Sequence, residues 1–262
     1  MPTDRYLEGM HAVVTGGSRG IGAAIAASLG RHGARLTLMA RSAGELANQA
    51  DALGQAAATS VHFVACDVTD DAALTAAFAR AVADLGPVQV LVNNAGAGLS
   101  ARFTSMTREM WDRMLAVNLT AAFSCSAHVL PAMLEAGAGR IVNIASTAGL
   151  RGYKTMTAYC AAKHGLVGLT RALALETAKH GVTVNAVCPG YTDTAMAGQA
   201  IANLVSVFDK TPEEARSMLV RNIPRGSLTT PAEVASAVAW LCSPHAAAVT
   251  GIALPVAGGE IA

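Results

Sequence analysis

The alternation of short apolar runs with longer helical patterns most strongly limits the folds open to this chain. Seven runs rich in Val, Ile and Leu predict strands near residues 11–15, 35–40, 61–66, 88–92, 140–145, 182–187 and 252–256. The stretches between them predict helices near 20–32, 43–53, 70–85, 107–136, 157–180 and 231–242. Strands without strict polar alternation are typical of a parallel sheet buried on both faces. The sequence therefore predicts an α/β fold, with one domain over residues 1–262, a doubly wound sheet of seven parallel strands and helices on both faces.

The junction between the first strand and the first helix is rich in glycine. Val13 and Val14 lead into a Gly-x-x-x-Gly-x-Gly turn at Gly16, Gly20 and Gly22, and an Ala-rich helix follows. Such a turn lets the backbone approach a pyrophosphate closely and points the N–H groups of the helix at it. The alternative is a tight strand-to-helix turn that binds no ligand. The turn predicts a Rossmann-type dinucleotide-binding domain.

Polar and small residues gather where the predicted strands end. Asp67, the segment 93–96, Ser146 and the pair at 189–190 all follow a strand directly. Ligands of doubly wound sheets bind beyond the carboxyl ends of the strands. One crevice is therefore expected to hold a dinucleotide and a substrate together.

A serine, a tyrosine and a lysine form the candidate catalytic set. Tyr159 and Lys163 are four residues apart, so on a helix both side chains leave the same face, and an ammonium can lie beside a phenol. A neighbouring cation favours the phenolate and should lower the pKa of the tyrosine. Ser146, from the preceding strand, would hydrogen-bond the oxygen that the tyrosine protonates. Tyr-x-x-x-Lys alone is a weak signal, and its weight comes from the accompanying motifs.

From about Leu7 to Gly259, these motifs in this order resemble the short-chain dehydrogenase/reductase family. The resemblance implies a catalytic set of Asn118, Ser146, Tyr159 and Lys163, in which Asn118 holds a water that supplies protons to the lysine. It implies hydride transfer from a nicotinamide to a carbonyl carbon, with Tyr159 as the proton donor and Lys163 bound to the nicotinamide ribose. The cofactor-binding residues expected on this basis, besides Tyr159 and Lys163, are Gly16, Ser18, Arg19, Gly20, Ile21, Gly22, Arg41, Asp67, Val68, Asn93, Asn94, Ala95, Gly96, Pro189, Gly190, Thr192 and Thr194.

The end of the second predicted strand indicates which cofactor is used. An acidic residue there would bind the ribose hydroxyls and repel a 2′-phosphate, whereas arginine does the reverse. This chain has Ala40 at that position, followed by Arg41, and Arg19 in the glycine turn adds a second positive charge. We therefore expect NADP(H). Both arginines could instead be solvated surface residues.

The segment at about 191–228 predicts a helical lid over the substrate. Its apolar side would consist of Met196, Ile201, Leu204, Val205, Phe208, Met218 and Leu219. The sequence here and after it is similar to 3-oxoacyl-thioester reductases and to ketoreductases of aromatic polyketide synthesis. The expected partner is therefore a small carbonyl substrate, either free or linked to coenzyme A or a carrier protein. The phosphate of such a carrier could meet Arg102, Arg151, Lys154, Arg221 or Arg225. The alternatives are a dehydrogenase of a small secondary or cyclic alcohol, and a non-catalytic dinucleotide-binding regulator.

Composition narrows the other classes of partner. The formal net charge of +1 gives no electrostatic reason to expect nucleic acid or an anionic membrane as a partner. The five scattered cysteines are typical of a reducing compartment, and the seven histidines form no metal-binding motif. The charged N-terminus does not resemble a signal peptide, and no stretch approaches the ~20 uninterrupted apolar residues of a membrane span. We expect a cytoplasmic protein without a metal.

Two predicted helices lack a polar face. The helix that carries Tyr159 has apolar or small residues on nearly every side, and the helix at 107–136 is similar. A helix of this kind is expected to be covered both by its own sheet and by a partner subunit. In the resembling family these two helices form a four-helix dimer contact, so we expect a homotetramer. Gly165 and Gly168 could instead serve close helix packing within one chain.

Overall fold

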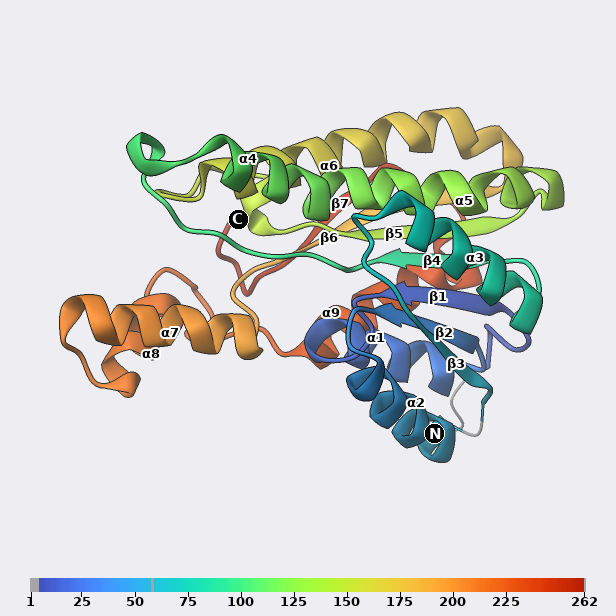
Figure 1. Ribbon diagram of the computed structural model, residues 1–262, viewed down its shortest axis with the longest axis horizontal. Helices are drawn as coiled ribbons and strands as arrows, with labels where there is room; N and C mark the ends of the chain where they lie inside the picture. The colour runs from blue at the N-terminus through green and yellow to red at the C-terminus, as the bar shows by residue number, and fades with distance from the viewer. Residues whose placement is uncertain (1–4, 58, 262) are drawn as a thin grey trace.

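A seven-stranded parallel sheet lies at the centre of the computed structural model, which describes residues 5–57 and 59–261 (Figure 1). Its strands lie in the order β3-β2-β1-β4-β5-β6-β7, and every neighbouring pair is parallel. They are β1 (His11–Thr15), β2 (Arg35–Ala40), β3 (Val61–Ala65), β4 (Val90–Asn93), β5 (Gly139–Ile144), β6 (Val182–Pro189) and β7 (Ala253–Val256). The order reverses between β1 and β4, which places the topological switch point beside the glycine turn.

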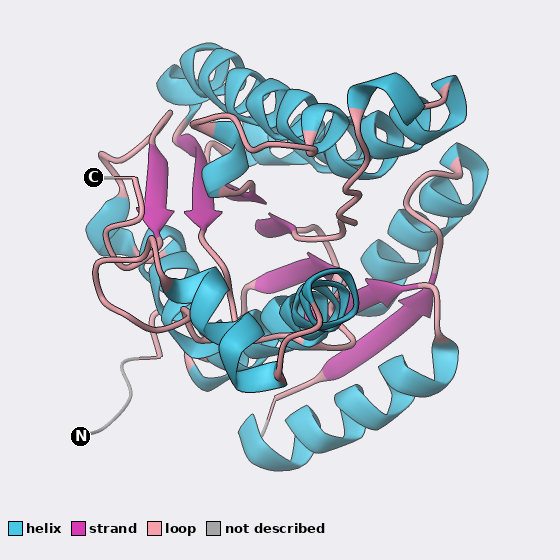
Figure 2. Ribbon diagram, turned by 90° about the vertical axis from the view of Figure 1, so that its left-hand side faces the viewer, coloured by secondary structure: helices cyan, strands magenta, loops and turns pink. Residues whose placement is uncertain are grey.

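Helices cover both faces of this sheet (Figures 1 and 2). On one face, α1 (Gly20–Arg31) packs on β1 and β2, α2 (Ala43–Ala57) packs on β2 and β3, and α9 (Pro231–Cys242) packs on β5, β6 and β7, burying Leu and Val side chains. On the other face, α3 (Asp71–Leu85) packs on β2 and β3, α5 (Ala121–Ala136) packs on β4 and β5, and α6 (Thr157–Thr177) packs on β6. The strand interiors are apolar because both of their faces are buried. The predicted doubly wound α/β fold is confirmed.

The helix predicted over 107–136 is continuous but irregular. It consists of α4 (Arg108–Leu115), a π-helical turn over Ala116–Thr120, and α5. The predicted helix over 157–180 is α-helical to Thr177 and ends in a 3-10 turn before the left-handed Gly181. The remaining predicted elements agree with the structure to within a few residues at their ends.

The expected lid contains two helices, α7 (Ala195–Phe208) and α8 (Pro212–Val220). Figure 1 shows them extending to one side of the layered core. A small apolar cluster of Ala197, Ile223 and Leu228 joins α7 to the residues that follow α8. The side chains of Met196, Phe208 and Met218 remain exposed, so much of the predicted apolar side is uncovered.

The α4–α5 stretch, 108–136, is long and apolar enough to cross a membrane by length and composition, with a mean hydropathy of 1.3. Polar residues such as Asn118, Ser126 and His128 interrupt this helix, so it is not a run of ~20 uninterrupted apolar residues. A core helix of a globular protein passes the same test, and this one packs against β4, β5, α3 and α6. The N-terminal residues 1–4, on which part of the signal-peptide expectation rests, lie outside the described residues.

The five cysteines are buried free thiols. Within 5–57 and 59–261, no group of three or more His, Cys, Asp or Glu side chains could hold a metal ion.

Candidate active site

Ser146, Tyr159 and Lys163 lie together beyond the carboxyl end of β5. Ser146 lies two residues after β5 and caps a short 3-10 turn, while Tyr159 and Lys163 project from the first two turns of α6. The phenol of Tyr159 is hydrogen-bonded to Ser146. The Lys163 ammonium is buried, donates to the carbonyl of Ile144 over 2.8 Å, and lies 5.7 Å from the centre of the Tyr159 ring. The structure thus brings the three predicted residues together.

Burial dominates the acidity of this group. It raises the pKa of Tyr159, and the hydrogen bond from Ser146 opposes this shift only in part. Burial also lowers the pKa of Lys163 to about 8. In the chain without a bound cofactor, therefore, Tyr159 is not the acidic phenol that was expected, because desolvation is the largest influence on its pKa. Tyr159 keeps its proton at neutral pH and is available as a donor.

Asn118 is buried in the π-helical turn between α4 and α5. Its amide donates to the carbonyl of Ala97 over 2.9 Å and accepts from the Ala97 N–H over 3.3 Å. A Cβ added to Gly96 would lie 2.8 Å from the Asn118 carbonyl oxygen and 3.7 Å from the Lys163 nitrogen. Asn118, carried by the π-turn, and Lys163 therefore both lie against the segment that follows β4.

The glycine turn after β1 is packed too tightly for side chains. A Cβ on Gly22 would lie 2.1 Å from the carbonyl oxygen of Gly16, which itself has a φ of +64°. The Asn94 amide donates to the carbonyls of Thr15 and Gly16 over 3.0 and 3.1 Å and so holds this turn. Arg19 precedes α1 without a side-chain cap, and the first turn of the helix has no acidic residue. The free N–H groups there fit a pyrophosphate.

The segment after β6 lies opposite the glycine turn. Thr192 donates to the carbonyl of Gly190 over 3.0 Å, and Thr194 donates to that of Thr192 over 3.2 Å. A Cβ on Gly20 would meet the Thr194 methyl at 3.5 Å. The predicted phosphate turn and the predicted nicotinamide-side loop, which begins at Pro189, therefore face each other.

The side chain of Asn93 turns into the protein interior. It is buried and donates to Asn143 over 2.8 Å and to Ser126 over 3.2 Å. Asn143 in turn donates to Thr170 over 2.9 Å. This network joins β4 and β5 to α5 and α6, so the Asn93 side chain supports the sheet under the cleft. The neighbouring Ala95 N–H is bonded to the Thr15 hydroxyl at 3.0 Å.

Asp67 accepts the N–H and hydroxyl of Thr69, which lowers the pKa of its carboxyl, and Arg41 contributes a smaller electrostatic effect. Val68 beside it is buried, while Ile21 in the glycine turn is half-buried.

The end of the site where the adenosine ribose is expected contains one group that the sequence did not reveal, Glu45. Glu45 on α2 pairs with Arg19 at 3.5 Å and accepts the Ser18 hydroxyl at 3.1 Å. A carboxylate thus holds the groups expected to bind a 2′-phosphate.

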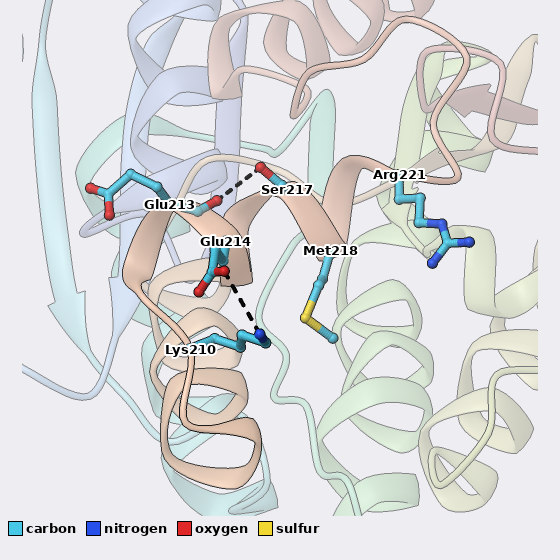
Figure 3. Close-up of a pocket in the computed structure, with 6 residues that line it drawn as sticks. All are labelled: Lys210, Glu213, Glu214, Ser217, Met218 and Arg221. Atoms are coloured by element: carbon cyan, nitrogen blue, oxygen red, sulfur yellow. Dashed lines mark hydrogen bonds and ion pairs between the residues drawn. The ribbon is translucent and has the colours of Figure 1, made fainter.

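Two of the five cations considered for a substrate phosphate are already paired. Arg151 binds Glu260 and Arg225 binds Glu233, whereas Arg102, Lys154 and Arg221 form no ion pair with the described residues. Figure 3 shows Arg221 at the edge of an open pocket on α8. A Lys210–Glu214 pair at 3.7 Å lies in this pocket, which none of the predicted catalytic or cofactor residues line.

The fold and the site together define a dinucleotide-dependent oxidoreductase of the Rossmann type, with a serine, a tyrosine and a lysine beside the cofactor cleft. Residues 10–204 match the family model described as short chain dehydrogenase. The chain therefore belongs to the short-chain dehydrogenase family.

Relatives and solved structures match nearly the whole chain. The acetoacetyl-CoA reductase of Rhizobium meliloti (strain 1021) is 41% identical over 95% of this chain and 97% of its own length. The 3-oxoacyl-[acyl-carrier-protein] reductase FabG of Vibrio harveyi is 38% identical over 97% of this chain and 98% of its own. A crystal structure of a variant of actinorhodin polyketide ketoreductase with NADPH has a TM-score of 0.92 and 42% identity, covering 96% of this chain and 97% of that one. Levodione reductase has a TM-score of 0.91 and 30% identity, covering 97% and 98%. The chain is an oxidoreductase that acts on CH–OH or carbonyl groups.

Proposed function

We propose that the chain is an NADPH-dependent carbonyl reductase of a 3-oxoacyl thioester, carried on coenzyme A or acyl carrier protein, or of a related ketone. The observation that carries this proposal is the Tyr159–Ser146 hydrogen bond above a buried Lys163, at the switch-point edge of the sheet. The likeness to an acetoacetyl-CoA reductase and to a polyketide ketoreductase supports the thioester or polyketide class.

The protein groups divide the work of carbonyl reduction. The glycine turn, Arg19 and Arg41 would hold NADPH, which would supply the hydride when bound. Tyr159 remains protonated because burial raises its pKa, so it can donate a proton as negative charge grows on the carbonyl oxygen. The Ser146 hydroxyl orients that oxygen by a hydrogen bond. Lys163 contributes positive charge from a buried position, and Asn118 fixes the backbone beside it.

Several features support NADP(H) over NAD(H). Ala40 and Arg41 end β2 without a carboxylate that would repel a 2′-phosphate. Arg19 is exposed on the nearby glycine turn, and its guanidinium can form a second contact with a 2′-phosphate. The similar polyketide ketoreductase structure contains NADPH.

Levodione reductase favours a second candidate, an NAD(P)-dependent dehydrogenase or reductase of a small secondary or cyclic alcohol. Its structure covers nearly all of this chain at 30% identity. Turnover with NADPH against acetoacetyl-CoA, longer 3-oxoacyl thioesters, cyclic diketones and simple ketones separates the two candidates. A kcat/KM highest for a thioester supports the first proposal, and one highest for a cyclic diketone supports the second.

Replacing the proposed proton donor tests the catalytic reading directly. Tyr159→Phe should lower kcat about 10²- to 10⁴-fold, the usual contribution of a general acid. The Kd for NADPH, measured by fluorescence, should change little. Wild-type turnover retained in this variant would contradict the proposed role of Tyr159.

We further propose a homotetramer and a cytoplasmic location. Exposed Phe123 on α5 and Leu175 on α6 support the oligomer, because both helices expose large apolar side chains. A Cβ on Gly165 would meet Leu119 at 2.8 Å, so this glycine serves packing within the chain, whereas a Cβ on Gly168 would point into open space.

A further inference from the structure

A buried carboxylate lies beside the catalytic serine segment without a role in the chemistry described above. Glu260 follows β7, and its side chain is only 2% exposed. Carboxylates are rarely buried to this extent without partners, since removing the charge from water is costly. The partners of Glu260 therefore indicate what it is for.

Three polar contacts hold Glu260 in place. Its Oε1 is 2.9 Å from Arg151 Nη2 and 2.6 Å from the Tyr153 hydroxyl. Arg151 also donates through Nη1 to the Glu260 backbone carbonyl over 3.2 Å. The Arg151 guanidinium lies 4.6 Å above the Tyr153 ring. Both partners belong to the segment that directly follows the Ser146 turn.

Tyr153 extends the contact to the residue next to the catalytic serine. Its hydroxyl oxygen is 2.7 Å from the hydroxyl of the buried Thr147. A carboxylate can only accept, so the Tyr153 proton goes to Glu260, and the Tyr153 oxygen accepts the proton of Thr147. Burial raises the pKa of Tyr153 to about 12, which keeps this donor protonated at neutral pH. The Ser146 Oγ itself accepts the N–H of Ala148 over 3.1 Å.

The second oxygen of Glu260 reaches the opposite wall of the cleft. Oε2 is buried and has no hydrogen-bond partner among the described residues. A Cβ added to Gly190 would lie 2.7 Å from it. The carboxylate is thus packed between the segment after Ser146 and the segment after β6.

We propose that Glu260 is a positioning residue for carbonyl reduction. Through Tyr153 and Thr147 it fixes the turn that carries Ser146, and through its packing on Gly190 it fixes the distance between the two walls of the cleft. This inference rests on the function proposed above. Glu260 contacts neither substrate nor the reacting atoms in this scheme and acts only through its neighbours.

The test compares Glu260→Ala, Glu260→Gln, Tyr153→Phe and the double variant Glu260→Ala/Tyr153→Phe as full chains. Glu260→Ala and Tyr153→Phe should each lower kcat for ketone reduction about tenfold, because small displacements of catalytic groups are costly. The Kd for NADPH should change less than kcat, since the glycine turn is untouched and only the Gly190 side of the expected cofactor site is affected. The double variant should lose no more than the worse single variant, because both act through one chain of contacts. Glu260→Gln keeps an acceptor for Tyr153 and should recover most of kcat.

Hydrogen exchange gives a readout that does not depend on turnover. The amides of Gly149, Leu150 and Arg151 are hydrogen-bonded within the Ser146–Arg151 turn. They should exchange faster in Glu260→Ala and Tyr153→Phe, while the strand amides keep their protection. Glu135→Ala, at an exposed glutamate on α5, is the matched control and should change neither kcat nor exchange.

Unchanged exchange of the 149–151 amides in Glu260→Ala would overturn the inference, as would additive losses in the double variant. A wild-type enzyme that reduces ketones while Glu260→Ala matches its kcat would overturn it and leave the proposed function intact. A wild-type chain that reduces no ketone would overturn the proposed function, and the exchange experiment would still decide whether Glu260 orders the turn.

Discussion

At the residue scale, Glu45 should compete with the 2′-phosphate of NADPH for Arg19. Its carboxylate pairs with Arg19 and accepts the Ser18 hydroxyl, so a 2′-phosphate would have to displace it and would be repelled by it. Glu45→Gln should therefore lower the Kd for NADPH up to about fivefold, the range of an exposed ion pair, and leave the Kd for NADH unchanged. Fluorescence titration with both cofactors measures this. Arg41→Ala is the matched control with the opposite effect and should raise the Kd for NADPH but not that for NADH. Equal changes in the two Kd values in Glu45→Gln would contradict the proposed competition.

Lys163 gives the reaction a pH limit. Burial lowers the pKa of this ammonium to about 8, while burial raises that of Tyr159, so the lysine is the first of the two to lose its proton. The protonated form is present below this value and lost as the pH rises through it. The kcat/KM for NADPH in ketone reduction should therefore fall above pH ~8, roughly tenfold per pH unit. Lys163→Arg, whose side chain stays charged, should be less active, but its kcat/KM should not change with pH up to pH ~10. If kcat/KM of this variant still falls above pH ~8, another group is responsible for the titration.

Single residues also mark how far sequence can predict the site. Ser146, Tyr159 and Lys163 could be placed together because helical spacing and a strand end fix their positions. Glu45 and Glu260 could not, since their partners are distant in sequence and a lone glutamate carries no pattern. Asn93 shows the reverse: its motif predicts a cofactor contact, but an asparagine at a buried strand end can equally bond inward, as it does to Asn143.

At the element scale, the two capping boxes of this chain should have different effects. Thr211 caps α8 and Thr230 caps α9 with the same geometry, each with a glutamate three residues on. α9 packs on α1 in the main core, whereas α8 contacts mainly α7 outside it. Thr230→Ala should therefore lower the free energy of unfolding by about 1 kcal/mol and Tm by about 2–4 °C. Thr211→Ala should leave Tm within about 1 °C, because only the lid loosens.

Calorimetry and hydrogen exchange of the two variants check this difference. Faster exchange confined to residues 195–220 is expected in Thr211→Ala. A fall in Tm as large as that of Thr230→Ala would mean that the lid unfolds together with the sheet.

The helices and strands could be predicted where a periodic apolar pattern is bounded by capping or turn residues. The strands and α1, α3 and α9 follow from apolar runs bounded by Gly, Asp or Thr-Pro. The π-turn at Ala116–Thr120 was not predictable as such, since one extra residue in a helical turn leaves the apolar pattern nearly unchanged. Its position depends on the Asn118–Ala97 bonds, which form only in the folded chain.

At the scale of the whole molecule, the parallel sheet follows from strand and helix alternation, but the strand order β3-β2-β1-β4-β5-β6-β7 does not. The order is decided by which helix faces match, and both faces of this sheet are similarly apolar. The same ambiguity applies to the outer helices, because an apolar outer face can be covered by a lid or by another subunit.

The exposed apolar residues of α5 and α6 predict where subunits meet. Phe123 is 57% and Leu175 is 83% exposed, on two helices that cover the same face of the sheet. If these faces pair in a homotetramer, Phe123→Asp/Leu175→Asp would bury charges in an apolar contact and should reduce the assembly to dimers or monomers. Size-exclusion chromatography with light scattering measures the mass. Met218→Asp, an equally drastic change at a 41% exposed residue of α8, should leave the tetramer intact. If the double variant is still a tetramer, the subunit interface must lie on another face. A monomeric wild-type chain would exclude the proposed tetramer.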